Sequence, residues 1–419
     1  MKVLLFGLGS RGDVQPFAAL GKGLQAAGYT VALAAGENFA GLAAEHGLGF
    51  EPIRVDIEAL MNSDIGKQWS DRGNNRSSDE LRHMRRLGVV TADPVADAVV
   101  SLIERYDVFI TGFLTLDPLA AAAAARGKIV IAGHLGPWPP TRSGAANFQA
   151  PFPDGESLFN AWMGYLVQVI LYFVLRPPTV EIRRRLHLPA PSLRAYLRAW
   201  NRTPALVGVS PLVVPPPPDW PSHVHTTGYW FLDAPSQWQP PPALTAFLDA
   251  GEPPVYIGFG SMASRNPQAT LNLMIAALTQ AGQRGVIYKG WAGFLPDRPL
   301  PDIFLLDGAP HDWLFPRMKA VIHHGGAGTT SAVLRAGVPG GIVVHAGDQA
   351  YWGRRTYELG VGAQPIPRAA LTVENLSGMI RALTGDPALR ERAAALGERI
   401  RAEDGIGNAV RAFTHIVQG

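Results

Sequence analysis

The chain has 419 residues, of which 47% are hydrophobic and 17% are charged, and its formal net charge is +3. A chain of this length suits two domains of about 200 residues each, and its hydrophobic share lies in the range of globular proteins. The absence of cysteine excludes disulfide bonds, thiolate nucleophiles and cysteine-ligated metal sites, and the small net charge gives no argument for nucleic-acid binding.

The first half of the chain alternates short apolar runs with segments of helical pattern. Strands are predicted at residues 2–8, 29–35, 49–55, 108–111, 129–132 and 206–209. Helices are predicted at residues 16–27, 40–46, 95–105 and 158–200, and a polar loop at 62–78. Such an alternation predicts a parallel sheet with helices on both of its faces.

Two proline runs, at residues 215–218 and 240–242, divide the sequence, because such runs are stiff and extended. The strand–helix alternation then resumes, with strands predicted at 255–258 and 304–306 and around residues 287, 321 and 342. We predict an α/β fold of two doubly wound, Rossmann-like domains. The predicted boundaries are an N-terminal domain at 1–210, a linker at 211–253, a C-terminal domain at 254–388 and C-terminal helices at 389–419.

Residues 320–330 carry the strongest functional signal of the chain. Two histidines and three glycines lie there between a predicted strand and a predicted helix: His323, His324, Gly325, Gly326 and Gly328. Glycines let the backbone approach a ligand closely. The amides at a helix start and the positive end of the helix dipole favour an anion, so this loop is predicted to bind phosphate.

A second polar motif, Gly347-Asp348-Gln349, follows the next predicted strand at 341–344. Ligands of open α/β sheets bind at the carboxyl ends of the strands. A carboxylate and an amide suit a sugar, because they accept hydrogen bonds from hydroxyl groups and donate to them. Phosphate on one loop and hydroxyl-binding groups on the next indicate a nucleotide sugar as the ligand.

These two motifs resemble the donor signature of the UDP-glycosyltransferase superfamily, which is glycosyltransferase family 1 with the GT-B fold. Residues 10–16, 227–230, 258–261 and 310–316 match the family as well, so the resemblance covers nearly the whole chain. Microbial sterol glucosyltransferase-like, macrolide and glycopeptide glycosyltransferases are the branches that it resembles most. The resemblance implies two domains that face each other across a cleft, with the tail at 389–419 crossing back to the first domain.

The resemblance also implies the residues of the donor site. His324 takes the position of the pyrophosphate-binding histidine, and Asp348 and Gln349 match the pair that binds sugar hydroxyls. The other implied donor contacts are Ser10, Gly12, Ser261, Trp291, Ala309, His311, Gly326, Gly328 and Thr329. Two positions depart from the plant members of the family. Gly308 replaces a tryptophan that stacks on uracil, so either Trp291 stacks instead or the backbone forms the slot for the base. Ala332 replaces a glutamate that binds ribose.

The loop after the first strand, Gly7-Leu8-Gly9-Ser10-Arg11-Gly12, fits the G-x-G-x-x-G pattern of dinucleotide-binding loops. Glu37 follows the second strand, where an NAD-binding acid belongs, so an NAD-dependent oxidoreductase is an alternative interpretation. Pro16 argues against this alternative, because it should disturb the helix start that receives the pyrophosphate. The alternative also leaves the motifs of the second half unexplained.

Asp13 in this loop is the predicted catalytic base. Glycosyl transfer needs a group that takes the proton of the acceptor hydroxyl, and a partly desolvated carboxylate with a raised pKa can do so. The resemblance supports this role, since the sterol-type and glycopeptide branches carry aspartate where many plant members carry histidine. Capping of the following helix is the alternative role, and one residue can serve both.

The first domain is expected to bind the acceptor through aromatic side chains, at Trp138, Phe148, Trp162 and Tyr165. They point to a large lipophilic alcohol or phenol such as a sterol, triterpenoid, macrolide or other polyketide, or carotenoid. The segment from Leu158 to Leu175 carries no charge over nearly the length of a membrane span. We interpret it as a helix that lines the acceptor pocket or the core. Additional contact to a membrane and a true membrane span are the alternatives.

Two arginine clusters, at 82–86 and 183–185, are interpreted as solvated helix faces, with contact to anionic lipid or to the donor as the alternative. No Asp-x-Asp pair that could hold Mg²⁺ on a diphosphate occurs in the chain, so neither a metal nor a cofactor is expected. The resemblance therefore implies an inverting, metal-independent transferase for a hexose, glucose first, from a UDP- or dTDP-sugar. A cytoplasmic monomer or weak dimer is expected, with membrane association as the alternative. A non-catalytic nucleotide-sugar-binding scaffold and a nucleotide-sugar epimerase are further alternatives.

Overall fold

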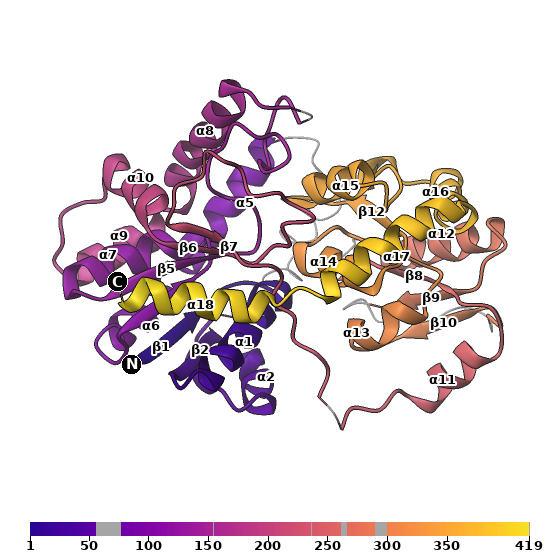
Figure 1. Cartoon of the computed structure of the whole chain (residues 1–419), viewed down its shortest axis with the longest axis horizontal. Coiled ribbons are helices and arrows are strands. Elements are labelled where there is room, and N and C mark those ends of the chain that lie inside the picture. Colours follow the sequence, from indigo (N-terminus) through magenta and orange to yellow (C-terminus); the bar gives the residue numbers. More distant parts are fainter. Residues whose placement is uncertain (56–76, 154, 236, 261–265, 290–299, 419) are drawn as a thin grey trace. The chain divides into compact units, whose positions relative to one another are not determined.

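The computed structural model describes the chain except for residues 56–76, 154, 236, 261–265, 290–299 and 419 (Figure 1). Most of the predicted loop at 62–78, and the predicted donor residues Ser261 and Trp291, lie outside the described residues. The chain forms two compact units. Unit 1 contains Met1–Ile57, Leu81–Leu232 and Glu403–Gly419, and the main part of unit 2 is Asp233–Ala402.

Unit 1 is built on a parallel sheet with the strand order β3-β2-β1-β4-β5-β6-β7. Its strands are β1 Lys2–Phe6, β2 Thr30–Gly36, β3 Gly49–Ile53, β4 Val108–Thr111, β5 Ile129–His134, β6 Ala205–Val207 and β7 Val224–Thr226. The order reverses between β1 and β4, so the carboxyl ends of these two strands form the topological switch point at which such sheets bind ligands. The predicted parallel sheet is confirmed.

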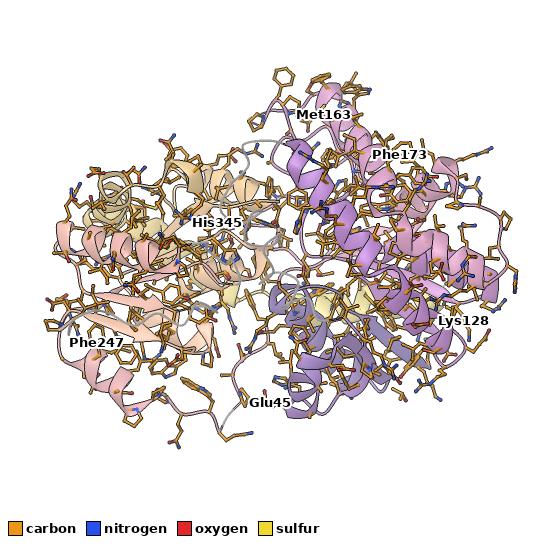
Figure 2. The ribbon with its side chains drawn as sticks, turned by 180° about the vertical axis from the view of Figure 1, so that it is seen from behind. Glu45, Lys128, Met163, Phe173, Phe247 and His345 are labelled. Atoms are coloured by element: carbon orange, nitrogen blue, oxygen red, sulfur yellow. The ribbon has the colours of Figure 1, made fainter. Side chains whose placement is uncertain are left out.

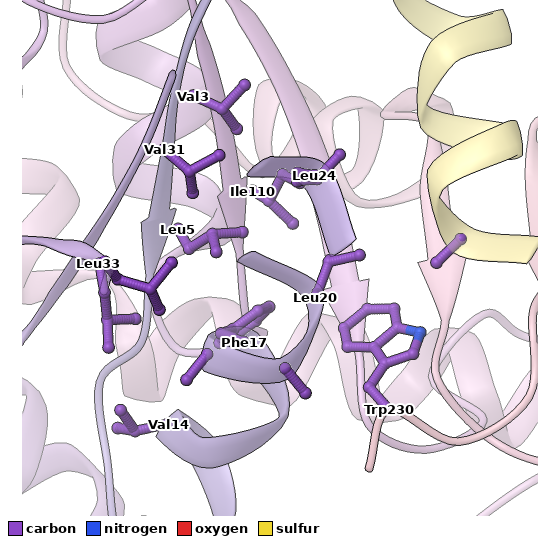
Figure 3. Packing of buried hydrophobic residues seen from close by; sticks show 14 of the residues in the cluster. Val3, Leu5, Val14, Phe17, Leu20, Leu24, Val31, Leu33, Ile110 and Trp230 are labelled. Carbon is purple, nitrogen blue, oxygen red and sulfur yellow. The ribbon is translucent and has the colours of Figure 1, made fainter. Parts of the chain in front are cut away.

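Helices cover both faces of this sheet, because neighbouring residues of a strand point to opposite sides. Val3 and Leu5 of β1 pack into one buried cluster with Phe17 and Trp230 (Figure 3), whereas Leu4 and Phe6 pack into another. The helices of unit 1 are α1 Arg11–Ala26, α2 Ala40–Glu45, α5 Ser77–Val90, α6 Ala92–Leu102, α7 Leu116–Arg126, α8 Leu158–Leu175, α9 Pro177–Arg185, α10 Leu193–Arg202 and α18 Gly405–Gln418, with the 3-10 turn η1 Glu37–Phe39. The predicted helical region 158–200 is thus three helices.

Helix α1 begins at Arg11 and not at Pro16, as the sequence had predicted. Proline inside a helix removes the hydrogen bond to the carbonyl four residues earlier, here that of Gly12. Gly12 is exposed, so water can bind its carbonyl group. The predicted disturbance of the helix start by Pro16 is therefore wrong, and the case against an NAD-binding loop needs another basis.

Unit 2 repeats the strand order of unit 1, with β10-β9-β8-β11-β12-β13, all paired in parallel. Its strands are β8 Val255–Gly258, β9 Gly285–Tyr288, β10 Ile303–Leu306, β11 Ala320–His323, β12 Gly340–Val344 and β13 Ile366–Pro367. Its helices are α11 Pro242–Asp249, α12 Pro267–Gln280, α13 His311–Leu314, α14 Ala327–Ala336, α15 Gln349–Glu358, α16 Val373–Gly385 and α17 Pro387–Arg401, with the 3-10 turns η3 Phe315–Arg317 and η4 Arg368–Ala370. The switch point of this sheet lies between β8 and β11.

Two segments that the sequence set apart are each divided between the units. Residues 211–232 of the predicted linker belong to unit 1, and residues 233–253 belong to unit 2. In the predicted tail, α17 belongs to unit 2 and α18 to unit 1. Phe413 of α18 is fully buried in unit 1, where its ring meets that of Tyr29 edge-on at 5.0 Å.

Candidate functional site

The loop between β11 and α14 leads into a helix whose start has no side-chain cap. The N-cap residue of α14, Gly326, has no side chain, and no acidic residue stands in the first turn. The first backbone amides of a helix, here those of Ala327, Gly328 and Thr329, have no partner within the helix. Gly325 has a φ of +92°, which favours glycine. These features suit an anion, and binding of phosphate at this loop stays a prediction.

The imidazole of His324 lies between two glycines at the switch point of unit 2. A Cβ atom at Gly260, after β8, would stand 2.8 Å from its Cε1 atom, and one at Gly326 would stand 2.6 Å from its Nε2 atom. A side chain at either position would therefore displace the ring of His324. Burial lowers the pKa of His324 to about 4, and its buried Nδ1 atom has no hydrogen-bond partner among the described residues. His324 is thus a neutral ring at pH 7, which can donate one N–H group to a phosphate oxygen.

His323, by contrast, shapes the loop from inside. It is only 1% exposed, and its Nδ1 atom accepts a hydrogen bond of 3.0 Å from the amide of Gly325. Burial, reinforced by His324 and His311, keeps its pKa well below the ordinary value. The side chain of His323 is therefore neutral at pH 7, and its Nδ1 atom is occupied by the hydrogen bond from Gly325.

The motif after β12 is ordered by its own side chains. The buried Gln349 carboxamide oxygen accepts hydrogen bonds from the amides of His345, at 2.7 Å, and Ala346, at 3.0 Å. The half-buried Asp348 accepts one of 2.7 Å from the indole N–H of Trp352. Gln349 thus fixes the backbone of the loop, and the assignment of both residues to sugar hydroxyls stays a prediction.

The remaining predicted donor residues of unit 2 lie after β10. The ring of His311 stacks on Phe315, with 4.2 Å between the ring centroids and an angle of 15°. Ala309 is half-buried against the apolar cluster that contains Leu314 and Phe315. His311 also lies near enough to His323 to help lower its pKa, so the segment after β10 is a neighbour of the loop between β11 and α14.

Asp13 lies in the first turn of α1, beside the switch point of unit 1. Its Oδ2 atom accepts hydrogen bonds from the backbone amide of Ser10, at 2.8 Å, and from the Ser10 hydroxyl, at 3.0 Å. Its Oδ1 atom makes no hydrogen bond within the described part of the chain. Burial raises the pKa of Asp13, and the two hydrogen bonds from Ser10 lower it. The carboxylate thus caps the helix through one oxygen and keeps the other available, so the two predicted roles are compatible.

Gly9 makes room for this carboxylate. Its φ of +144° favours glycine, and a Cβ atom there would stand 2.3 Å from Oδ2 of Asp13. The same carboxylate argues against NAD binding, because it places a negative charge at the helix start that would receive the pyrophosphate. Ser10, a predicted donor contact, is engaged with Asp13. Gly12, another, is exposed in the first turn of α1.

Two of the predicted acceptor residues belong to one aromatic group in unit 1. Trp138 stacks on Phe113, with 4.4 Å between the centroids, and meets Phe148 edge-on at 5.0 Å and Trp200 at 5.8 Å. Trp162 and Tyr165, in contrast, are about half exposed on α8, where Trp162 stacks on Phe159 at 5.2 Å. The structure therefore separates the predicted acceptor residues into a half-buried pair, Trp138 and Phe148, and a more exposed pair, Trp162 and Tyr165.

The aromatic group contains polar atoms that the sequence did not reveal. His134 stacks on Trp200 at the end of β5, and Tyr196 lies beside Trp200 on α10. Three of their buried polar atoms have no hydrogen-bond partner among the described residues, namely His134 Nδ1, Tyr196 Oη and Trp200 Nε1. Burial lowers the pKa of His134 to about 4. No motif marked these residues, because their spacing is that of ordinary core positions.

Two family models match the chain. Residues 3–136 match the glycosyltransferase family 28 N-terminal domain. Residues 295–409 match the C-terminal domain of erythromycin biosynthesis protein CIII-like proteins. The first match contains Asp13 and the second contains both motifs of unit 2, so the predicted resemblance to glycosyltransferases is confirmed.

Curated relatives match the chain over almost its whole length. Sterol 3-beta-glucosyltransferase UGT80B1 of Arabidopsis thaliana is 35% identical over 99% of this chain and 68% of its own length. Sterol 3-beta-glucosyltransferase UGT80A2 of the same plant is 33% identical over 99% of this chain and 65% of its own. A sterol 3-beta-glucosyltransferase of Emericella nidulans is 34% identical, but the chain spans only 30% of that protein.

Solved structures share the fold at lower identity. The glycosyltransferase of kitacinnamycin superposes with a TM-score of 0.69 at 20% identity, over 100% of this chain and 98% of that one. Glycosyltransferase VinC in complex with DTDP gives a TM-score of 0.65 at 18% identity, over 99% and 100% of the two chains. Together with the two parallel sheets, these similarities confirm the predicted GT-B fold.

Proposed function

Since this chain belongs to the GT-B UDP-glycosyltransferase family that includes the sterol 3-beta-glucosyltransferases, we propose that it transfers glucose from UDP-glucose to a hydroxyl group of a lipophilic acceptor. The transfer inverts the anomeric carbon and needs no metal ion. The observation that carries this proposal is Asp13, whose carboxylate is tethered through one oxygen and open at the other.

The donor half of the reaction is assigned to unit 2. The diphosphate binds the amides at the start of α14 and the N–H group of His324, which together stabilise the negative charge of the leaving group. Neutral donors at a helix start can take over the charge stabilisation that a metal ion supplies elsewhere. Asp348, on the loop that Gln349 holds in shape, is assigned to the sugar hydroxyls.

The acceptor half is assigned to unit 1. Asp13 Oδ1 takes the proton of the acceptor hydroxyl while the acceptor oxygen forms its bond to the anomeric carbon. The bond from that carbon to the phosphate oxygen breaks, and UDP leaves with the bonding electrons. One displacement on one face of the sugar inverts the configuration. The raised pKa of Asp13 makes the carboxylate a stronger base than an exposed one.

The relatives support a lipophilic acceptor and glucose as the sugar, because each of them is a sterol 3-beta-glucosyltransferase by name. We assign Trp138, Phe148 and Trp200 to the acceptor rings and the polar atom of His134 to an acceptor hydroxyl. Two of the similar structures hold thymidine diphosphate, so dTDP-glucose is the second donor to test.

The test is UDP release from UDP-glucose in EDTA, with and without a panel of lipophilic alcohols. Acceptor-dependent release supports transfer without a metal ion. Release with dTDP-glucose alone would correct the nucleotide. Binding of the nucleotide sugar without any release would favour the scaffold protein. Absence of nucleotide binding would reject the proposal and favour an oxidoreductase.

Two variants test the role of Asp13. Asp13→Ala removes both the base and the cap, whereas Asp13→Asn keeps an oxygen that can accept from Ser10 and removes only the base. Both should lower kcat by about 10²-fold or more and leave UDP binding unchanged, since general base catalysis contributes that much. Equal loss in both UDP binding and turnover, or an active Asp13→Asn variant, would contradict the assignment.

A further inference from the structure

Helix α8 differs from an ordinary surface helix, because it has polar side chains in the interior and large apolar side chains at the surface. Its two polar residues in the interior, Asn160 and Gln168, are 0% and 2% exposed. The Asn160 amide group donates hydrogen bonds to the carbonyls of Arg142 and Phe152, both at 2.9 Å, and Gln168 accepts one of 2.8 Å from Asn201. The polar side of α8 is therefore satisfied inside unit 1.

The outer side of α8 is apolar along its whole length. Leu158, Trp162, Tyr165 and Phe173 recur at three or more residues apart on one face and are 73%, 53%, 50% and 51% exposed. Phe152 and Phe159 add rings near the start of the helix. We call these six residues the α8 stripe. Figure 2 shows side chains projecting from α8 between the labelled Met163 and Phe173.

The exposed large apolar side chains are concentrated in the α8 stripe and are not spread evenly over the surface. Among the described residues, eleven large apolar side chains are exposed, and six of them form the stripe. A contiguous apolar surface of this kind marks an interaction site in a soluble protein. Tryptophan, tyrosine and phenylalanine are also the residues that favour the boundary between lipid and water.

Cationic groups flank the α8 stripe. Arg142 lies at the start of the helix, where its carbonyl binds Asn160, and Arg176 follows the last residue. The exposed Arg85 donates a 2.7 Å hydrogen bond to the carbonyl of Phe173 from the neighbouring helix α5, which also carries the exposed Arg86. Among the side chains that the structure describes here, one acid, Glu156, is exposed just before the helix. The described charges beside the stripe are therefore mainly positive, which complements an anionic surface.

The second arginine cluster, at residues 183–185, differs from the arginines beside α8 because it has acidic partners. Arg184 and Arg185 form ion pairs with Glu181, and Arg185 also pairs with Asp93 and Asp97. Their charge is neutralised within unit 1. Of the two clusters considered from the sequence, the one beside α8 is therefore the one suited to lipid.

We propose that the α8 stripe docks unit 1 onto an anionic phospholipid bilayer, with α8 lying flat in the interface. By length and composition alone, α8 is the one helix within the described residues that could span a membrane, and only a third of it is buried. A spanning orientation would expose Asn160 and Gln168 to hydrocarbon, whereas a flat one keeps both bound to the protein. Apolar rings enter the acyl boundary while the arginines meet the headgroups.

The test is co-sedimentation of the full chain with vesicles of phosphatidylcholine alone or with phosphatidylserine. The double variant Trp162→Glu/Phe173→Glu should lower binding to the anionic vesicles by about tenfold or more, because it removes buried apolar area and adds repulsion. The control is Tyr357→Glu, which changes a ring that is 54% exposed on α15 of unit 2 and should bind as the unaltered chain does. Arg85→Gln/Arg86→Gln should weaken binding only to the anionic vesicles.

Unchanged binding of the double variant, or binding equal to neutral and anionic vesicles, would overturn the proposal. A chain that ignores vesicles but dimerises through the same residues in analytical ultracentrifugation would overturn it in favour of a second copy. The far-ultraviolet circular dichroism melt shows whether each variant is folded, and Trp162→Ser supplies a milder change. The assay contains neither donor nor acceptor, so its failure would leave the proposed transferase activity untouched.

Discussion

The two loops at the switch points of this protein occupy equivalent places in equivalent sheets, yet they treat charge in opposite ways. The loop after β1 leads into a helix whose first turn holds the carboxylate of Asp13, with Ser10 as its N-cap. The loop after β11 leads into a helix with Gly326 as its N-cap and no acid in the first turn. At the third helical position, one unit has Asp13 and the other has Thr329.

The difference teaches how one architecture can serve two chemistries. A helix start stabilises one negative charge, whether it comes from the protein or from a ligand. Unit 1 supplies that charge itself through Asp13, whereas the first turn of α14 in unit 2 carries no acid, so a ligand can supply the charge there. The glycine pattern alone cannot distinguish the two cases, because both loops are rich in glycine.

The largest expected effect comes from giving unit 2 the charge pattern of unit 1. Thr329→Asp places a carboxylate at the third position of α14, and UDP binding should fall by about 10²-fold or more, because like charges a few ångströms apart repel strongly. Isothermal titration calorimetry measures this. The melting temperature should hold or rise, since an acid in the first turn stabilises a helix. The control is Thr329→Val, which removes only the hydroxyl, and normal UDP binding by Thr329→Asp would show that phosphate binds elsewhere.

An intermediate effect is expected from crowding the base of unit 1. Gly9→Ala places a Cβ atom 2.3 Å from Oδ2 of Asp13 and forces alanine to a φ of +144°. We expect kcat to fall by about tenfold or more as the carboxylate is displaced, with UDP binding unchanged. Gly41→Ala is the matched control, because no atom lies within 4 Å of its new Cβ. Equal kcat values for the two variants would show that the shape of this loop does not affect catalysis.

The smallest effect is expected from Ser10→Ala, which removes the 3.0 Å hydroxyl hydrogen bond to Asp13 and keeps the 2.8 Å amide one. Both bonds favour the ionised carboxylate, so the pKa of Asp13 should rise further. Because the base acts when ionised, the acidic limb of kcat/KM against pH should move to higher pH. Activity should fall by about threefold on that limb and stay unchanged in alkali, as expected for one weak hydrogen bond. Ser10→Thr should restore the profile, and a uniform loss at every pH would argue for a structural role.

The sequence was sufficient where a motif depends on backbone geometry. Gly325, Gly326 and the strand before them predicted the glycine-rich turn and the start of α14, because such a tight turn leaves few residue types to choose from. The start of α1 was predicted five residues too late, at Pro16, because proline is common in the first turn of a helix. The spacing of Ser10-Arg11-Gly12-Asp13, which is that of a capping box, indicates the earlier start.

Other features depend on contacts between segments far apart in the chain. The apolar composition of α8 predicted either a buried or a membrane-facing helix, and only the partners of Asn160 and Gln168 show which side faces inward. The spacing of Trp162 is equally compatible with a pocket and a surface. Likewise, Gln349 carries the family motif in sequence, but the amides that it binds become visible only once the loop is folded.

The division of the C-terminal segment has a consequence for biosynthesis. Helix α18 is translated after the whole of unit 2, yet its Ala409 and Phe413 fill the core of unit 1 between residues of the first strand and helix. A nascent chain on the ribosome therefore carries an unfinished first domain while the second is being made. Domains commonly fold one after another during synthesis. In this protein unit 2 can finish folding before unit 1, because unit 1 is complete only once α18 has been made.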